Sequence, residues 1–89
     1  MTESDFAWTA VVRLRLDDTT LADWLDQALR PEASREVPRA QAEIRRGEGN
    51  SLELTIRARD SGAMRAALNT YLGWIHLSLA TARSARGQN

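Results

Sequence analysis

The spacing of apolar residues switches between a period of two and a helical period along this 89-residue chain, and the order of these switches is the strongest constraint on its fold. Residues 6–16 alternate apolar and polar side chains, with Trp8 and every second residue after it on one side, which predicts a strand with one buried face. Apolar residues then recur at helical spacing over 21–29, after the capping side chains of 17–20. Pro31 is expected to end this helix.

Two more alternating segments and a long apolar helix make up the second half of the chain. Residues 39–46 and 52–58 alternate on either side of a turn at 47–50 that contains two glycines, which predicts a hairpin. Asp60 and Ser61 can cap a final helix, which is expected to fray beyond Arg83. Its expected buried stripe consists of Met64, Ala67, Leu68, Tyr71, Leu72, Ile75, Leu79 and Ala82.

The resulting order is strand, helix, strand, strand, helix, with a polar loop at 31–38. Such a chain folds most economically as an α+β, two-layer structure in which both helices cover the apolar face of a three-stranded antiparallel sheet. A chain of 89 residues has room for one core, so we expect a single domain over 1–89 with an ordered core at about 6–83.

The chain carries few groups that could do catalysis. It has no cysteine, and its one histidine, His76, lies between apolar residues, where a structural or interface role is expected. The turn at 47–50 lacks the lysine and the strand-to-helix context of a phosphate-binding loop. We therefore expect no enzymatic activity, no cofactor and no metal.

No apolar run approaches the ~20 residues that span a bilayer, and residues 1–5 do not resemble a signal peptide. A cytoplasmic protein without a membrane partner is expected.

Strand alternation predicts an arginine-rich open face on the sheet. Each guanidinium could bind phosphate through two hydrogen bonds, although aromatic residues for stacking on bases are missing there. The alternative is a solvated face with cross-strand pairs to Glu43 and Glu53. The candidate nucleic-acid residues on this face are Arg13, Arg15, Arg39, Arg45, Arg57 and Arg59.

The final helix has more apolar residues than one stripe against a sheet can bury, so part of it is expected to face a partner. Trp74 and Leu77 are the expected exposed anchors. The alternative is that the first helix and the aromatic residues of the first strand cover this surplus. The candidate partner-binding residues are Met64, Leu68, Tyr71, Trp74, Ile75, Leu77 and Leu79.

The segment SLELTIRARDSGAMRAALNTYLGWIHLSLA, residues 51–80, resembles the small dimerisation subunit family of the archaeal-type KEOPS tRNA-modification complex. The family's helix pattern, Arg-Ala-x-x-Asn-Ser/Thr-Tyr-Leu-x-Trp, runs here from Arg65 to Trp74. Pro31-Glu32 and Pro38-Arg39 around the second strand are also similar to the family, whereas Gly73 stands where the family has a larger and often basic residue.

The resemblance implies a non-catalytic homodimer that docks its helices on a metal-dependent threonylcarbamoyl transferase, with a kinase-like subunit further along. That complex modifies adenosine 37 of tRNAs that read codons beginning with A. Tyr71, Trp74, Ile75, Leu77 and Leu79 would then pack on the transferase or the dimer mate, and Arg65 and the sheet arginines would touch tRNA. The alternative is a free-standing homodimeric RNA-binding module that uses its arginine-rich sheet face.

Overall fold

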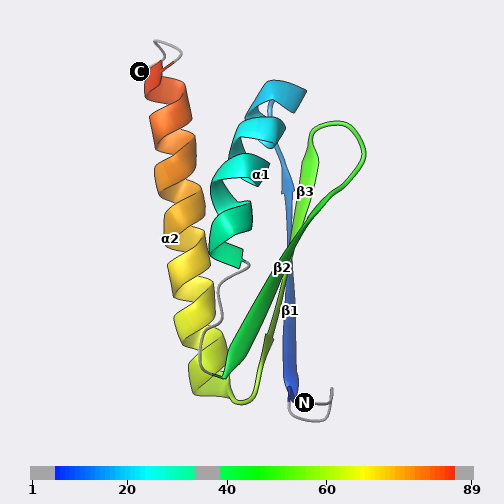
Figure 1. Ribbon diagram of the computed structural model, residues 1–89, viewed down its shortest axis with the longest axis vertical. Coiled ribbons are helices and arrows are strands. Elements are labelled where there is room, and N and C mark those ends of the chain that lie inside the picture. Colours follow the sequence, from blue (N-terminus) through cyan, green and yellow to red (C-terminus); the bar gives the residue numbers. More distant parts are fainter. Residues whose placement is uncertain (1–5, 34–38, 86–89) are drawn as a thin grey trace.

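Three strands and two helices form the part of the chain that the computed structural model describes, residues 6–33 and 39–85 (Figure 1). In chain order they are β1 (Trp8–Arg15), α1 (Thr19–Ala33), β2 (Ala40–Arg46), β3 (Ser51–Ala58) and α2 (Ser61–Ala85). The two helices lie side by side on one face of the sheet (Figure 1). The predicted α+β class and the predicted order of elements are confirmed.

The sheet is antiparallel, with strand order β1-β3-β2. The central strand β3 is covered most completely, because Leu52, Leu54, Ile56 and Ala58 are all buried. Its intervening residues lie on the open face, which carries the polar side chains. The two edge strands therefore present their outer backbone groups away from the sheet.

An aspartate caps each helix. The backbone N–H of Leu21 donates to Asp18 Oδ1 at 2.8 Å, and that of Ala63 donates to Asp60 Oδ1 at 2.8 Å. Each carboxylate satisfies an N–H group that has no partner inside its helix. The predicted caps are confirmed at both positions.

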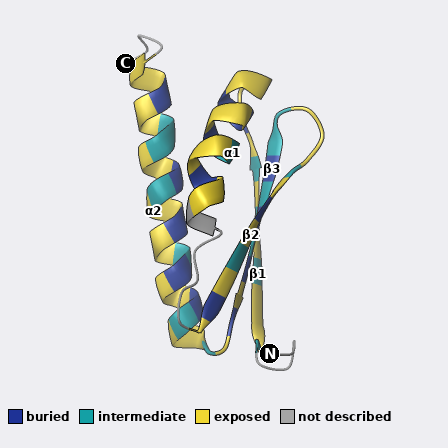
Figure 2. Cartoon of the chain, in the orientation of Figure 1, coloured by how far each residue is buried: buried dark blue, intermediate teal, exposed yellow. Residues whose placement is uncertain are grey.

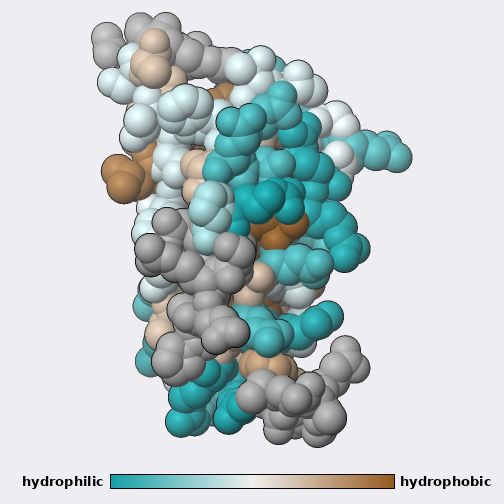
Figure 3. All heavy atoms as spheres, viewed as in Figure 1, coloured by the Kyte–Doolittle hydropathy of each residue, from teal (hydrophilic) through white to brown (hydrophobic). Residues whose placement is uncertain are grey.

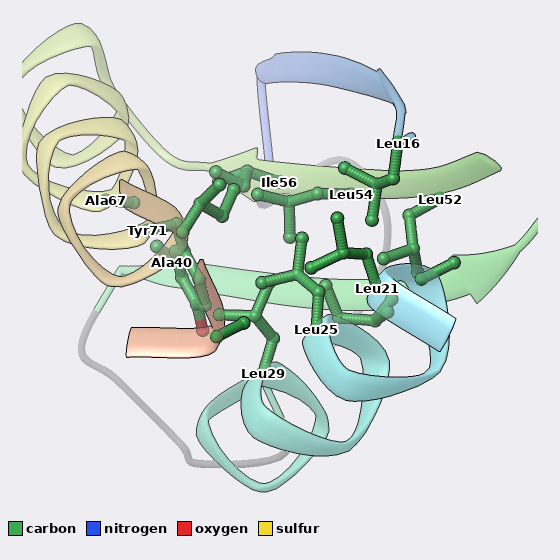
Figure 4. Close-up of a cluster of buried hydrophobic side chains, with 14 of the residues drawn as sticks. Leu16, Leu21, Leu25, Leu29, Ala40, Leu52, Leu54, Ile56, Ala67 and Tyr71 are labelled. Atoms are coloured by element: carbon green, nitrogen blue, oxygen red, sulfur yellow. The ribbon is translucent and has the colours of Figure 1, made fainter. Parts of the chain in front are cut away.

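The core lies between the sheet and the two helices. Leu21, Leu25 and Leu29 of α1 lie one above the other at helical spacing and point toward the sheet (Figure 4). Fully burying a leucine or isoleucine stabilises a fold by ~1.5–3 kcal/mol, so this cluster dominates the stability. Across from these leucines lie Leu16, Leu52, Leu54, Ile56, Ala67 and Tyr71.

The first helix was predicted to end at Pro31. In the structure it continues to Ala33. Proline lacks the N–H that would bond four residues back, and in a helix interior this costs ~3 kcal/mol. Here Pro31 lies in the last turn, where little helix remains to be disrupted. Residues 31–33 of the expected loop are thus helical, and 34–38 lie outside the described residues.

The second strand begins one residue later than predicted. Arg39 adopts a left-handed backbone with φ 71°, which is incompatible with a strand, and β2 starts at Ala40. At the other end of the hairpin Gly49 has φ 61°, a conformation that glycine adopts without steric cost. The predicted hairpin with its glycine-bearing turn is confirmed.

Several residues that were predicted to be buried lie at the margins of the core. Trp8 is 49% exposed, because β1 is an edge strand and Trp8 is its first residue. Leu72 is 45% exposed, since it lies 100° around α2 from the buried Tyr71. Trp24 and Ala28, which belong to the apolar pattern of residues 21–29, are also exposed. The apolar pattern identified which side of each element faces the core, but it assigned too many residues to that buried side.

Candidate interaction surfaces

Helix α2 buries a single stripe against the sheet and α1 (Figure 2). The stripe consists of Met64, Ala67, Tyr71, Ile75 and Ala82. Apolar side chains on both sides of this stripe are left partly exposed, with Leu72 at 45% on one side and Leu77 at 63% on the other.

On one side, α2 and β1 enclose an apolar groove of about 350 Å³, which we call the β1–α2 groove. Its apolar walls are the exposed Trp8 and Leu72 and the half-buried Leu68. Arg65 and Asn69 lie at its margin, since they follow the same side of the helix as Leu72. The complete lining is Trp8, Ser61, Met64, Arg65, Leu68, Asn69 and Leu72.

The edge of β1 beside this groove is open to a further strand. Within the described residues β1 pairs with β3 alone, and its first five residues, 8–12, carry no charge. The other edge strand, β2, carries Glu43, Arg45 and Arg46 among its seven residues. Charged side chains on an edge strand discourage pairing with other chains, so β1 is the more receptive edge.

The opposite side of α2, which we call the Leu77 flank, carries Trp74 and Leu77. Leu77 is 63% exposed, as predicted. Trp74 was predicted to be an exposed anchor but is half-buried, because its ring packs edge to face on Tyr71 with centroids 5.2 Å apart. A shallow hollow of about 190 Å³ lies beside it, lined by Ala40, Ala63, Ala66, Ala67, Thr70, Tyr71 and Trp74.

The Leu77 flank continues toward α1. The indole N–H of Trp24 donates to the backbone oxygen of Ser78 at 3.2 Å, while the Trp24 side chain stays 43% exposed. Apolar atoms project from the α2 side of the molecule in the space-filling view (Figure 3). Apolar surface is thus present on both sides of the buried stripe.

The seven candidate partner-binding residues do not form one surface. Met64, Tyr71 and Ile75 belong to the chain's own core and offer a partner little surface. Leu68 and Leu79 are half-buried on the side of α2 that faces β1. The prediction placed the exposed anchors on the Trp74 and Leu77 side of the helix and missed the exposure of Trp8 and Leu72 on the other side. No local pattern in the sequence shows that the cover over these two residues is incomplete.

The sheet's open face carries the predicted arginines, but several are paired with carboxylates. Arg13 Nε lies 3.0 Å from Glu53 Oε2, and Arg45 lies 3.5 Å from Glu43. In the register of the sheet Arg13 and Arg45 both lie opposite Glu53, one from each neighbouring strand. The carboxylates therefore offset much of the positive charge in the middle of the face.

The remaining arginines of the set are distributed differently. Arg15 and Arg57 are exposed on the open face, and Arg59 is exposed just beyond the end of β3. Arg39 precedes β2 and pairs with Asp60 at the start of α2. Arg65 is placed in the other layer, beside the β1–α2 groove, so it does not share a surface with the sheet arginines.

No group of three metal-binding side chains comes together in residues 6–33 and 39–85. His76, predicted to be structural or at an interface, is exposed on α2. Neither α1 nor α2 is long and apolar enough to cross a membrane.

Comparison with known proteins assigns the family. A family described as "Transcription factor Pcc1" matches residues 9–83, which is most of the chain. A chain in the crystal structure of the binary complex Gon7-Pcc1 has the same fold, with a TM-score of 0.77 and 14% sequence identity over 90% of this chain and 98% of that one. Comparison with curated proteins gave no match. The chain therefore belongs to the Pcc1 family, the family of small KEOPS subunits that its last helix resembles.

Proposed function

We propose that this chain is a non-catalytic, dimerising subunit of a KEOPS complex, and that it supports threonylcarbamoylation of adenosine 37 in tRNA by binding the transferase subunit. The observation that carries this proposal is the division of the apolar surface of α2 into two sides. A scaffold that dimerises and also holds an enzyme needs two separate contacts. The β1–α2 groove and the Leu77 flank provide two such surfaces.

We assign the dimer contact to β1 and the β1–α2 groove. The uncharged edge of β1 can pair with the same strand of a second copy, since a two-fold axis brings identical edges together in antiparallel orientation. Trp8 and Leu72 of each copy would then lie next to the paired β1 strands. There the β1–α2 grooves of the two copies would adjoin each other. Strand pairing would supply hydrogen bonds, and the groove residues would supply apolar burial.

We assign transferase docking to the Leu77 flank. Leu77 is the most exposed large apolar side chain of the described residues. The positions that precede it on this side of α2 are small, with Ala66, Thr70 and Gly73 spaced three or four residues apart. Small residues allow another helix to approach closely, and a leucine beyond them can insert between its side chains. Such a surface suits a helical partner.

The family and the solved neighbour support an assembly role. The neighbour's crystal structure is that of a binary complex with a second chain, Gon7. Members of this fold can thus form complexes with other proteins, and the apolar surfaces described above give this chain the means to do so.

The proposal is tested by co-purification with the transferase subunit of the same organism. We expect the unaltered chain to bring down the transferase, and Leu77→Asp to abolish that association because it places a charge against an apolar partner. Leu72→Asp is the matched control, because the same substitution on the other side of α2 should impair the dimer while leaving docking intact. Retention of the transferase by Leu77→Asp would refute the assignment of this flank.

A free-standing RNA-binding dimer is a second candidate, favoured by one observation. Arg15 and Arg57 lie on the open face without a carboxylate directly opposite them in the sheet, since their register partners are Ser51, Thr9 and Gln41. RNA binding by the isolated chain, together with failure to bind the transferase, would favour this alternative.

A further inference from the structure

Four polar side chains surround a hollow on the open face of the sheet, over the β2–β3 pair. Gln41 lies directly opposite Arg57, and Glu43 lies directly opposite Thr55. These two cross-strand pairs are adjacent on the same face, since they are two residues apart along each strand. The hollow has a volume of about 310 Å³ and is lined by Gln41, Ala42, Glu43, Thr55 and Arg57.

Arg57 differs from Arg13 and Arg45 in having no carboxylate directly opposite it in the sheet. Two rows along the sheet from Arg57, Arg13 and Arg45 lie on either side of Glu53, so their row contains a carboxylate directly opposite both of them. The residues directly opposite Arg57 are Thr9 and Gln41, and neither is charged. Its guanidinium, with five N–H donors in a planar fork, is thus suited to an external anion.

The chemistry of the quartet favours a ligand with a phosphate and a nearby hydroxyl. Arg57 can bind two phosphate oxygens at once, and the Gln41 amide and the Thr55 hydroxyl can donate further hydrogen bonds. Glu43 would repel a bare anion, but its carboxylate accepts a hydrogen bond from a hydroxyl group. Arg45 contacts one carboxylate oxygen of Glu43, Oε2, which leaves Oε1 for a ligand.

The spacing of the two charged groups agrees with such a ligand. Arg57 and Glu43 occupy diagonal positions in neighbouring strands, which places their backbones ~7–8 Å apart. Their side chains can therefore engage different parts of one ligand, a phosphate at one end and a hydroxyl at the other. We propose that this hollow binds a ribose-phosphate unit of an RNA strand, with Arg57 on the phosphate and Glu43 accepting from the ribose 2′-hydroxyl.

This site deepens the proposed tRNA-related function, and it can fail while the scaffold role stands. The hollow has no aromatic side chain on which a base could stack, so it would recognise the RNA backbone and not its sequence. The 2′-hydroxyl is the feature by which a protein distinguishes RNA from DNA at one position. Contact through Glu43 therefore predicts a preference for RNA over DNA of the same sequence.

The test uses the full chain, isotopically labelled for NMR, titrated at low salt with a single-stranded oligouridine RNA and with its 2′-deoxy counterpart. We expect the amide signals of Gln41, Glu43, Thr55 and Arg57 to shift with the RNA. Arg57→Gln should weaken RNA binding ~10- to 100-fold, because it removes charge-assisted hydrogen bonds to the phosphate. Arg15→Gln removes the same charge from the far end of the same face and should have a much smaller effect.

Glu43→Met separates the hydroxyl contact from general electrostatics. It removes the negative charge together with both acceptor oxygens at similar side-chain length, so affinity for any nucleic acid should rise, but the ratio of RNA to DNA affinity should fall toward one. Equal losses from Arg57→Gln and Arg15→Gln would overturn the site in favour of diffuse charge attraction. An unchanged RNA-to-DNA ratio in Glu43→Met, or equally strong binding of inorganic phosphate, would also overturn it. Light scattering on the same samples shows whether the dimer persists, which keeps this outcome separate from failure of the scaffold role.

Discussion

Replacing Leu72 by alanine should weaken the dimer without unfolding the chain. The side chain is 45% exposed in the single chain, so just under half of its burial energy is available to a partner. Full burial of a leucine contributes ~1.5–3 kcal/mol, so each copy would lose about 1 kcal/mol of association energy. A two-fold interface contains the substitution twice, and the loss of about 2 kcal/mol corresponds to a ~30-fold increase in the dimer dissociation constant. Sedimentation equilibrium over a range of concentrations measures this constant.

Leu77→Ala is the control for this measurement. Leu77 is more exposed than Leu72, at 63%, and a rule based on exposure alone would give it the larger effect. Its position on the other side of α2 predicts an unchanged dimer. The reasoning is refuted if Leu77→Ala weakens the dimer and Leu72→Ala does not, since the two surfaces would then be exchanged.

Three further substitutions test the fold. Gly73→Ala should raise the free energy of unfolding by ~1 kcal/mol in thermal or urea denaturation, because the added methyl group meets open space and alanine is the better helix former; a loss of stability would show that the position is not free. Asp18→Ala should lower it by ~1 kcal/mol by removing the acceptor for the N–H of Leu21, and Asp18→Asn should restore most of that loss. Ile56→Ala should cost ~2–5 kcal/mol, since Ile56 is fully buried in the central strand, and a cost below 1 kcal/mol would contradict the described core.

The order of elements could be predicted from the sequence because local signals agreed with one another. Asp18 and Asp60 precede apolar residues at helical spacing, and both cap helices in the structure. The alternation of 52–58 is strict, and this segment became the central strand, in which every second residue is buried. Pro31 misled the prediction because its cost depends on how much helix follows it, which the sequence alone does not show.

The interaction surfaces were only partly predictable, because they depend on distant parts of the chain. Alternation indicated which arginines share the open face, but not that Arg13 lies opposite Glu53 while Arg57 lies opposite Gln41. This register links strands that are up to about 50 residues apart, and no local pattern encodes it. Similarly, helical spacing cannot show how far around α2 the sheet and α1 bury its side chains. For that reason Leu72 was predicted to be buried, although it is exposed.

The most direct test of the scaffold role is the mass of the complex that forms when this chain is co-expressed with the transferase subunit of its own organism. Native mass spectrometry would give the number of copies of each chain. The account predicts two copies of this 9.9 kDa chain with one or two transferase chains. A transferase that purifies without this chain, or a complex that contains a single copy of it, would contradict the account.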